Sequence, residues 1–289
     1  MSALIEGLRG NPGFLTGACI ALGLIVGSFL NVVIHRLPLM MRREWGRECR
    51  ELLELPQETS APALTLSKPG SHCPACKAPI RPWQNVPVLS WLLLRARCAN
   101  CRAPISIRYP LVELAAGAAA GVCAWRFGWS PALAGTLLLS WTLLALAMID
   151  VDTQLLPDDL TLPLLWLGLL FSLFGATVPL GDAVIGAMAG YLSLWLVYHL
   201  FRLVTGKEGM GYGDFKLLGA LGAWLGWKML PLVILLSSAV GAVVGLLLIL
   251  IRKQDRSVPI PFGPYLAAAG WLALIWGPQI LAWYPLARS

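Results

Sequence analysis

The chain has 289 residues, of which 57% are hydrophobic and only 13% are charged. Soluble domains carry roughly 25% charged residues, so this composition and a mean hydropathy of +0.71 exclude an ordinary soluble protein. The formal net charge is +7, which indicates a nucleic-acid partner only if the basic residues form a binding surface. We therefore expect an all-α polytopic membrane protein.

The first apolar segment, about 14–34, is long enough to cross a membrane and has no small-residue cleavage site. We expect a membrane span there rather than a cleavable signal peptide. Gly23, Gly27 and Ser28 would let a neighbouring helix approach closely. Asn31 falls at the inner end, where it could bond to that helix or to a substrate backbone.

The one large polar segment, 36–108, holds 12 of the 22 Lys and Arg residues. Its first part, Met40 to Leu55, is charged and predicts an amphipathic helix on the membrane surface. Residues 56–70 are rich in Pro, Ser and Thr and indicate a linker.

Four of the seven cysteines form two C-x-x-C pairs separated by twenty-one residues. They are Cys73, Cys76, Cys98 and Cys101. This spacing predicts a four-thiolate zinc site, with iron or an empty site as the alternatives. Four sulfurs leave no open coordination position, so the metal would be structural and would supply folding energy to a loop with little apolar core. We expect no ligand role for the adjacent His72.

Seven further spans are expected after this loop, which makes eight in total. They lie at about 109–127, 131–149, 159–178, 183–203, 214–227, 230–251 and 263–284. The predicted organisation has three parts: a first transmembrane helix (1–35), a cytoplasmic loop (36–108) with a zinc-ribbon-like module at 73–101, and a seven-helix catalytic core (109–289).

The basic residues predict the orientation. If the large loop is cytoplasmic, the loops near 150–158, 202–216 and 252–261 share its side, and together they hold 18 of the 22 basic residues. The last of these loops carries Arg252, Lys253 and Arg256. The positive-inside rule then places both termini outside. The basic charge is explained by topology and contact with anionic lipid, so no nucleic-acid partner is expected.

Two aspartates lie where apolar segments meet this same side. Asp150 closes one span, and Asp214 opens another after Gly209, Gly211 and Gly213, which allow a tight turn and close approach. Ionisable groups at this depth are functional candidates. If the two carboxyls meet, they can share a proton as in aspartic proteases, and helix dipoles would favour Asp214 as base and Asp150 as acid.

Other charged residues near this pair have simpler explanations. Asp158 and Asp159 suit the N-terminus of the next helix, and Asp152 would project about 200° away from Asp150. Lys216 would leave its helix on the side opposite Asp214.

Three functions fit these residues. The first is an aspartic intramembrane endopeptidase. The second is a transporter or channel in which the aspartates relay protons or ions and the cysteine loop docks a partner. The third is a scaffold that uses the cysteine loop as an adaptor. Ordinary helix caps in headgroup water are the plainest explanation of each aspartate alone.

Taken together, several motifs resemble those of the type IV prepilin peptidases. They are Gly27-Ser28-Phe29-Leu30-Asn31-Val32-Val33, Arg36-Leu37-Pro38, the two cysteine pairs, Arg108-Tyr109-Pro110-Leu111-Val112-Glu113, Ile149-Asp150, Leu156-Pro157-Asp158, Gly209-Met-Gly-Tyr-Gly-Asp214-Phe-Lys216 and Pro261-Phe262-Gly263-Pro264.

The resemblance covers nearly the whole chain and implies a bifunctional enzyme of the bacterial inner membrane, with its site facing the cytoplasm. Asp150 and Asp214 would form the catalytic pair. The enzyme would cleave prepilins and pseudopilins of type IV pilus and type II secretion systems after the glycine of a basic leader. It would then methylate the new N-terminus with S-adenosylmethionine.

One departure concerns the methyltransferase. The resembled family often has glycine where this chain has Ala96. The sequence has no glycine-rich loop of Rossmann type, so it assigns no residues to S-adenosylmethionine. Glu113 is a candidate polar group for either activity or a simple helix-start charge.

Overall fold

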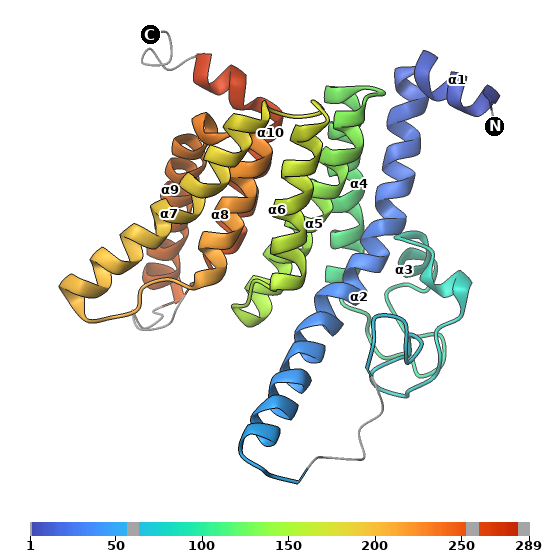
Figure 1. Ribbon diagram of the computed structural model, residues 1–289. Coiled ribbons are helices and arrows are strands. Elements are labelled where there is room, and N and C mark those ends of the chain that lie inside the picture. The colour runs from blue at the N-terminus through green and yellow to red at the C-terminus, as the bar shows by residue number, and fades with distance from the viewer. Residues whose placement is uncertain (1, 57–63, 253–259, 283–289) are drawn as a thin grey trace. The chain divides into compact units, whose positions relative to one another are not determined.

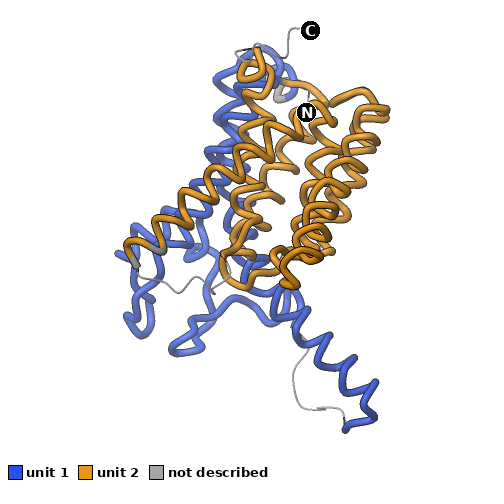
Figure 2. The backbone as a smooth tube through the Cα atoms, turned by 90° about the vertical axis from the view of Figure 1, so that its left-hand side faces the viewer, with its two compact units in different colours: residues 1–128 blue, residues 129–289 orange. Residues whose placement is uncertain are grey.

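The computed structural model describes residues 2–56, 64–252 and 260–282, and these form helices and connecting turns without a β-sheet (Figure 1). The chain divides into two compact units, Met1–Gly128 and Trp129–Ser289 (Figure 2). The predicted fold class, an all-α membrane protein with a four-cysteine loop, is confirmed. The functional division into 1–35, 36–108 and 109–289 stays a prediction.

The described residues of the first unit form four α-helices and one short 3-10 helix. They are α1 (Ser2–Gly10), α2 (Pro12–Leu52), η1 (Pro82–Asn85), α3 (Leu89–Leu93) and α4 (Arg108–Phe127). The second unit contains α5 (Pro131–Thr153), α6 (Asp158–Leu173), α7 (Leu180–Thr205), α8 (Tyr212–Leu225), η2 (Trp227–Met229), α9 (Leu230–Arg252) and α10 (Gly263–Ala282).

A helix is present at each of the eight predicted spans, but only five described helices are long and apolar enough to cross a membrane. These five include α2, α5, α7 and α10, together with the segment Trp227–Leu248. By contrast, α6 and α8 have 16 and 14 residues. At 1.5 Å per residue they reach roughly 24 and 21 Å, less than a hydrocarbon core of about 30 Å. The count of eight spans therefore stays a prediction.

The first unit is held together by close packing of α2 on α4. A Cβ on Gly23 would lie 2.6 Å from the Ala116 carbonyl oxygen, and one on Gly27 would lie 2.6 Å from the Glu113 Cα atom. The two backbones are so close that only glycine fits at these positions, as the small residues of α2 predicted. At the next turn Asn31 donates from Nδ2 to the Tyr109 carbonyl at 3.1 Å, which is a packing contact.

The polar half of α2 differs from the prediction. The sequence predicted a separate amphipathic helix from Met40, whereas α2 runs as one helix of 41 residues through Pro38. Arg36, which is buried, donates from Nη1 to the Thr65 carbonyl at 3.0 Å. This bond anchors the second half of the predicted linker, 56–70, to α2. Residues 57–63 of that linker lie outside the described part of the chain.

The second unit is built around α8. Every residue from Asp214 to Leu225 except Lys216 is buried, because α6, α7 and α10 surround the helix. A Cβ on Gly186 of α7 would lie only 2.2 Å from the Gly222 carbonyl oxygen, so these two helices also meet backbone to backbone. Since α8 packs against protein on nearly every side, it need not match the thickness of the lipid.

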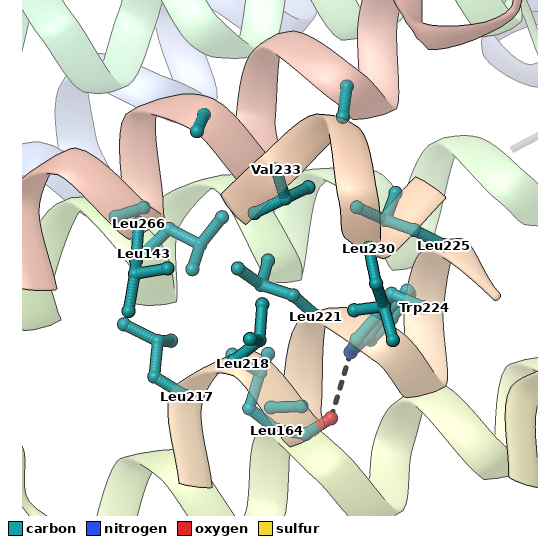
Figure 3. Packing of buried hydrophobic residues seen from close by; sticks show 14 of the residues in the cluster. Leu143, Leu164, Leu217, Leu218, Leu221, Trp224, Leu225, Leu230, Val233 and Leu266 are labelled. Atoms are coloured by element: carbon teal, nitrogen blue, oxygen red, sulfur yellow. Dashed lines mark hydrogen bonds between the residues drawn. The ribbon is translucent and has the colours of Figure 1, made fainter. Parts of the chain in front are cut away.

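Trp224 fixes α8 against α6. Its indole Nε1 donates to the Leu164 carbonyl at 2.8 Å, within a cluster of buried leucines from α5, α6, α8 and α10 (Figure 3). A buried indole N–H needs such a partner, because leaving it unpaired is costly. The basic residues Lys253 and Arg256, used above to predict orientation, lie outside the described residues.

Candidate active site and metal centre

Asp150 lies in the last turn of α5, where the helix is closed by Gln154. Gln154 adopts a left-handed conformation, and its N–H donates to the Asp150 carbonyl at 2.9 Å. The Asp150 side chain is buried, with 5% of the residue exposed. Its Oδ2 accepts a hydrogen bond of 2.9 Å from the backbone N–H of Gly263, the first residue of α10.

Asp214 lies in the first turn of α8, which begins after Gly211. It is also buried, and its Oδ1 has no hydrogen-bond partner among the residues that the structure describes. The Asp214 carboxyl is close enough to that of Asp150 for their charges to repel. The structure thus brings the two predicted residues together, although 64 positions separate them in the sequence.

Glycines around this pair are explained by close approach. A Cβ on Gly213 would lie 2.7 Å from the Leu156 Cβ atom, and one on Gly263 would lie 2.7 Å from Asp150 Oδ2. Leu156 is also 3.1 Å from the position of that second Cβ. The tight turn expected at Gly209, Gly211 and Gly213 is not seen as a positive φ at any of the three. The positive φ in this connection is at Gly206, directly after α7.

The ion pair beside the aspartates was missed by sequence reasoning. Lys216 Nζ lies 2.7 Å from each carboxylate oxygen of Asp158. Asp158 does lie in the first turn of α6, as expected of a capping charge. The partner of Lys216 lies on α6, which the helix geometry of α8 alone could not reveal.

Glu113 in the first unit is more than a helix-start charge. It is buried in α4 and accepts a 2.7 Å hydrogen bond from the Val88 N–H, immediately before α3. Val88 has φ of +59°, which is costly for a β-branched residue. The bond therefore holds a strained turn of the loop against α4.

The four cysteines form one cluster in the first unit. All four Sγ atoms lie within 4.8 Å of one another, and those of Cys73 and Cys101 are 3.8 Å apart. Tetrahedral zinc with sulfur at 2.3 Å requires roughly 3.8 Å between sulfurs, so the donor set and its spacing fit zinc. The ring Nδ1 of His72 lies 3.1 Å from the Gly70 carbonyl oxygen, and a ligand set made of the four thiols alone stays a prediction.

The two C-x-x-C pairs have the same pattern of backbone hydrogen bonds. Cys73 N–H donates to the Ala78 carbonyl and Cys98 N–H to the Ala103 carbonyl. Across the cluster, the side-chain amide of Asn100 donates to Cys76 Sγ at 3.5 Å, which helps to lower the pKa of the Cys76 thiol to about 6. A lower pKa favours the thiolate, which is the form that binds metal.

The helical membrane unit with two buried carboxyls near enough to repel, together with the four-thiol module, has the features of a membrane-embedded enzyme. The chain belongs to the type IV leader peptidase family, whose sequence model matches residues 137–246. The bacterial peptidase A24 N-terminal domain matches residues 21–127. The first match contains both aspartates and the second contains all four cysteines. Family membership supports the peptidase reading over the transporter or channel.

Relatives match the chain over most of its length. A protein of Stutzerimonas stutzeri is 59% identical over 97% of both chains, and one of Pseudomonas aeruginosa is 55% identical over 97% of both. A protein of Neisseria gonorrhoeae is 52% identical over 87% of both. All three are named prepilin leader peptidase/N-methyltransferase. The search of solved structures found no significant match.

Proposed function

We propose that this chain is an aspartic endopeptidase of the bacterial inner membrane that removes the basic leader from type IV prepilins and pseudopilins after glycine. It then methylates the new N-terminus with S-adenosylmethionine. The observation that carries the proposal is the meeting of Asp150 and Asp214 in a buried site at the ends of two helices. The names of the relatives support both activities.

The pair supplies what peptide hydrolysis requires. One carboxylate takes a proton from water as the water oxygen bonds to the scissile carbonyl carbon, and the other, protonated, donates its proton to the carbonyl oxygen. When the tetrahedral intermediate collapses, the C–N bond breaks and the leaving amine takes up a proton from the pair. Both carboxyls lie in the second unit, so this unit alone holds the groups for cleavage.

Methylation acts on the amine that cleavage releases. The amine nitrogen forms a bond to the methyl carbon as the bond from that carbon to the sulfonium sulfur breaks, and the amine loses one proton. Cleavage must come first, because before it this nitrogen belongs to a peptide bond and is a poor nucleophile.

The cysteine module would hold zinc through Cys73, Cys76, Cys98 and Cys101. A bound zinc ion supplies folding energy to the loop, and four thiolates fill its coordination sphere. The bonds from Asn100 and the two repeated turns orient the sulfurs for this purpose. The positive-inside distribution supports a cytoplasmic position for this module and for the active site.

The test is to incubate purified protein with a prepilin and S-adenosylmethionine and to read product masses. We expect a cleaved product that is also heavier by one methyl group. Asp150→Asn and Asp214→Asn should each abolish cleavage while the protein stays folded and inserted. Full cleavage by either variant would refute the aspartic mechanism.

A further inference from the structure

The N-terminus of α10 bears directly on the aspartate pair. The first N–H groups of a helix have no partner within it, and they carry the positive end of the helix dipole. In α10 the first such group is the Gly263 N–H. It donates a buried hydrogen bond of 2.9 Å to Asp150 Oδ2. Gly263 lies outside the residues that match the family model, which end at 246.

The two aspartates differ in the donors that they receive. Asp150 accepts a well-formed bond from Gly263. Asp214 is approached by the Gly211 N–H, but its Oδ1 is enclosed without a partner in the described residues. Hydrogen-bond donors stabilise the charged carboxylate. A carboxyl oxygen that is buried without a donor instead favours the neutral carboxylic acid. The helix-dipole argument from sequence favours charge on Asp214, but a hydrogen bond to a charged oxygen is the stronger effect.

On the basis of the proposed function, we propose that Gly263 is a positioning residue that holds Asp150 as the ionised member of the pair, with the proton on Asp214. Asp150 then accepts the proton of the attacking water, and Asp214 donates to the scissile carbonyl. This assignment is the reverse of the one that helix dipoles predicted from the sequence.

The requirement for glycine gives the inference a direct test. A Cβ on residue 263 would lie 2.7 Å from Asp150 Oδ2, so Gly263→Ala must push the carboxylate off the N–H. Loss of one hydrogen bond to a charged group corresponds to a decrease of roughly 10- to 100-fold in a rate or equilibrium constant. We expect kcat to fall by about that factor with KM little changed, because the carboxylate acts on the water rather than on substrate binding.

The pH profile separates this role from a packing role. If Asp150 is the base, loss of the Gly263 bond destabilises its carboxylate form. The fall of kcat/KM at low pH, the acid limb of the profile, then moves to higher pH. The charged and titratable residues on the helices around Asp150 are Asp152 on α5, Asp158 and Asp159 on α6, Tyr212, Asp214 and Lys216 on α8, and Tyr265 on α10. The substitution alters none of them, so a shift would report the lost N–H contact.

Two control variants match the test variant. Gly181→Ala adds a Cβ near the start of α7 with nothing within 4 Å, and should leave kcat and the acid limb unchanged. Gly270→Ala adds a Cβ in α10, about two helical turns after Gly263, that would lie 2.4 Å from the Leu221 Cδ2 atom. It should lower the melting temperature but leave the acid limb of the folded enzyme in place.

The outcomes are distinct. If wild type cleaves and both Asp→Asn variants do not, the proposed function holds, and wild-type kcat and acid limb in Gly263→Ala would overturn the present inference alone. If wild type does not cleave prepilin, the proposed function itself fails. Should Gly263→Ala not fold, adding Leu156→Ala removes the 3.1 Å contact and keeps the carboxylate clash. The double variant must then show the acid-limb shift relative to Leu156→Ala, and its absence overturns the inference.

Discussion

Lys216 on α8 and Asp158 on α6 form a two-oxygen ion pair, with Nζ 2.7 Å from each carboxylate oxygen. The pair joins the helix that begins at the Asp214 turn to the helix that follows Asp150. The Lys216 side chain is 29% exposed and that of Asp158 is 52% exposed. Water therefore screens much of the attraction, and the link is expected to orient the helix ends more than to stabilise the bundle.

We expect Lys216→Met and Asp158→Asn each to lower the free energy of unfolding by at most about 1 kcal/mol. Because they remove the same contact, the double variant should lose less than the sum. A double-mutant cycle of unfolding in detergent, at low and high salt, measures this coupling. Asp159→Asn, in the same helix turn, serves as the control and should be additive with Lys216→Met. Additivity for Asp158 too would mean that the ion pair contributes nothing.

The contact between α2 and α4 predicts a strong effect at Gly23. In Gly23→Ala the new Cβ would lie 2.6 Å from the Ala116 carbonyl and 2.8 Å from the Gly117 Cα, both backbone atoms. Forcing the helices apart should cost about 1–3 kcal/mol. Gly17→Ala in the same helix meets nothing within 4 Å and should gain a few tenths to about 1 kcal/mol from helix propensity. Thermal unfolding of the two variants should move in opposite directions, and equal melting temperatures would contradict the close packing.

The cysteine cluster predicts metal-dependent folding of its own loop. Cys76→Ser should lower bound zinc well below one equivalent and open residues 64–105 to proteolysis, because the loop has little apolar core without metal. Cys49→Ser, at an exposed cysteine on α2, is the matched control and should keep full metal content. Elemental analysis with limited proteolysis measures both effects. A full equivalent of zinc in Cys76→Ser would show that these thiols are not the ligand set.

Ala96 predicts a stabilising substitution. Its φ is +58°, a left-handed conformation that costs a residue with a Cβ about 1–2 kcal/mol. Ala96→Gly removes this cost but loses about 0.4–1 kcal/mol to the freedom of glycine in the unfolded chain. We expect a net gain of about 0.5–1 kcal/mol, read as slower proteolysis of the metal-loaded loop. Ala103→Gly, where φ is not positive, should instead speed proteolysis; protection by both substitutions would count against backbone strain at Ala96.

The sequence predicted which residues the fold brings together better than it predicted what surrounds them. Asp150 and Asp214 could be paired because one ends and the other begins an apolar segment on the same predicted side. The four cysteines could be grouped because the C-x-x-C spacing of metal ligands is visible within a short stretch of sequence. The bond from Gly263 to Asp150 joins a backbone donor to a side chain 113 positions away, and such a donor has no mark in the sequence. For the same reason the sequence did not reveal the partner of Lys216 on α6.

Helix boundaries were harder to predict where polarity changes without a change of conformation. The rise in charge after Met40 indicated a new helix, but α2 continues through Pro38. Its 41 residues extend about 60 Å along the helix axis. For the short helices α6 and α8, composition predicted the presence of a helix but not its environment. Their apolar composition indicated spans, yet α8 is covered by protein, which composition alone does not distinguish from lipid.

The enclosure of α8 limits how solvent can enter. From Asp214 to Leu225 only Lys216 is not buried, whereas Gly211 and Tyr212 at the start of the helix are exposed. We therefore expect the hydrolytic water and any carboxyl-modifying reagent to reach Asp214 from the start of the helix. A water-soluble carbodiimide should then label Asp214 sooner than a reagent confined to the acyl chains.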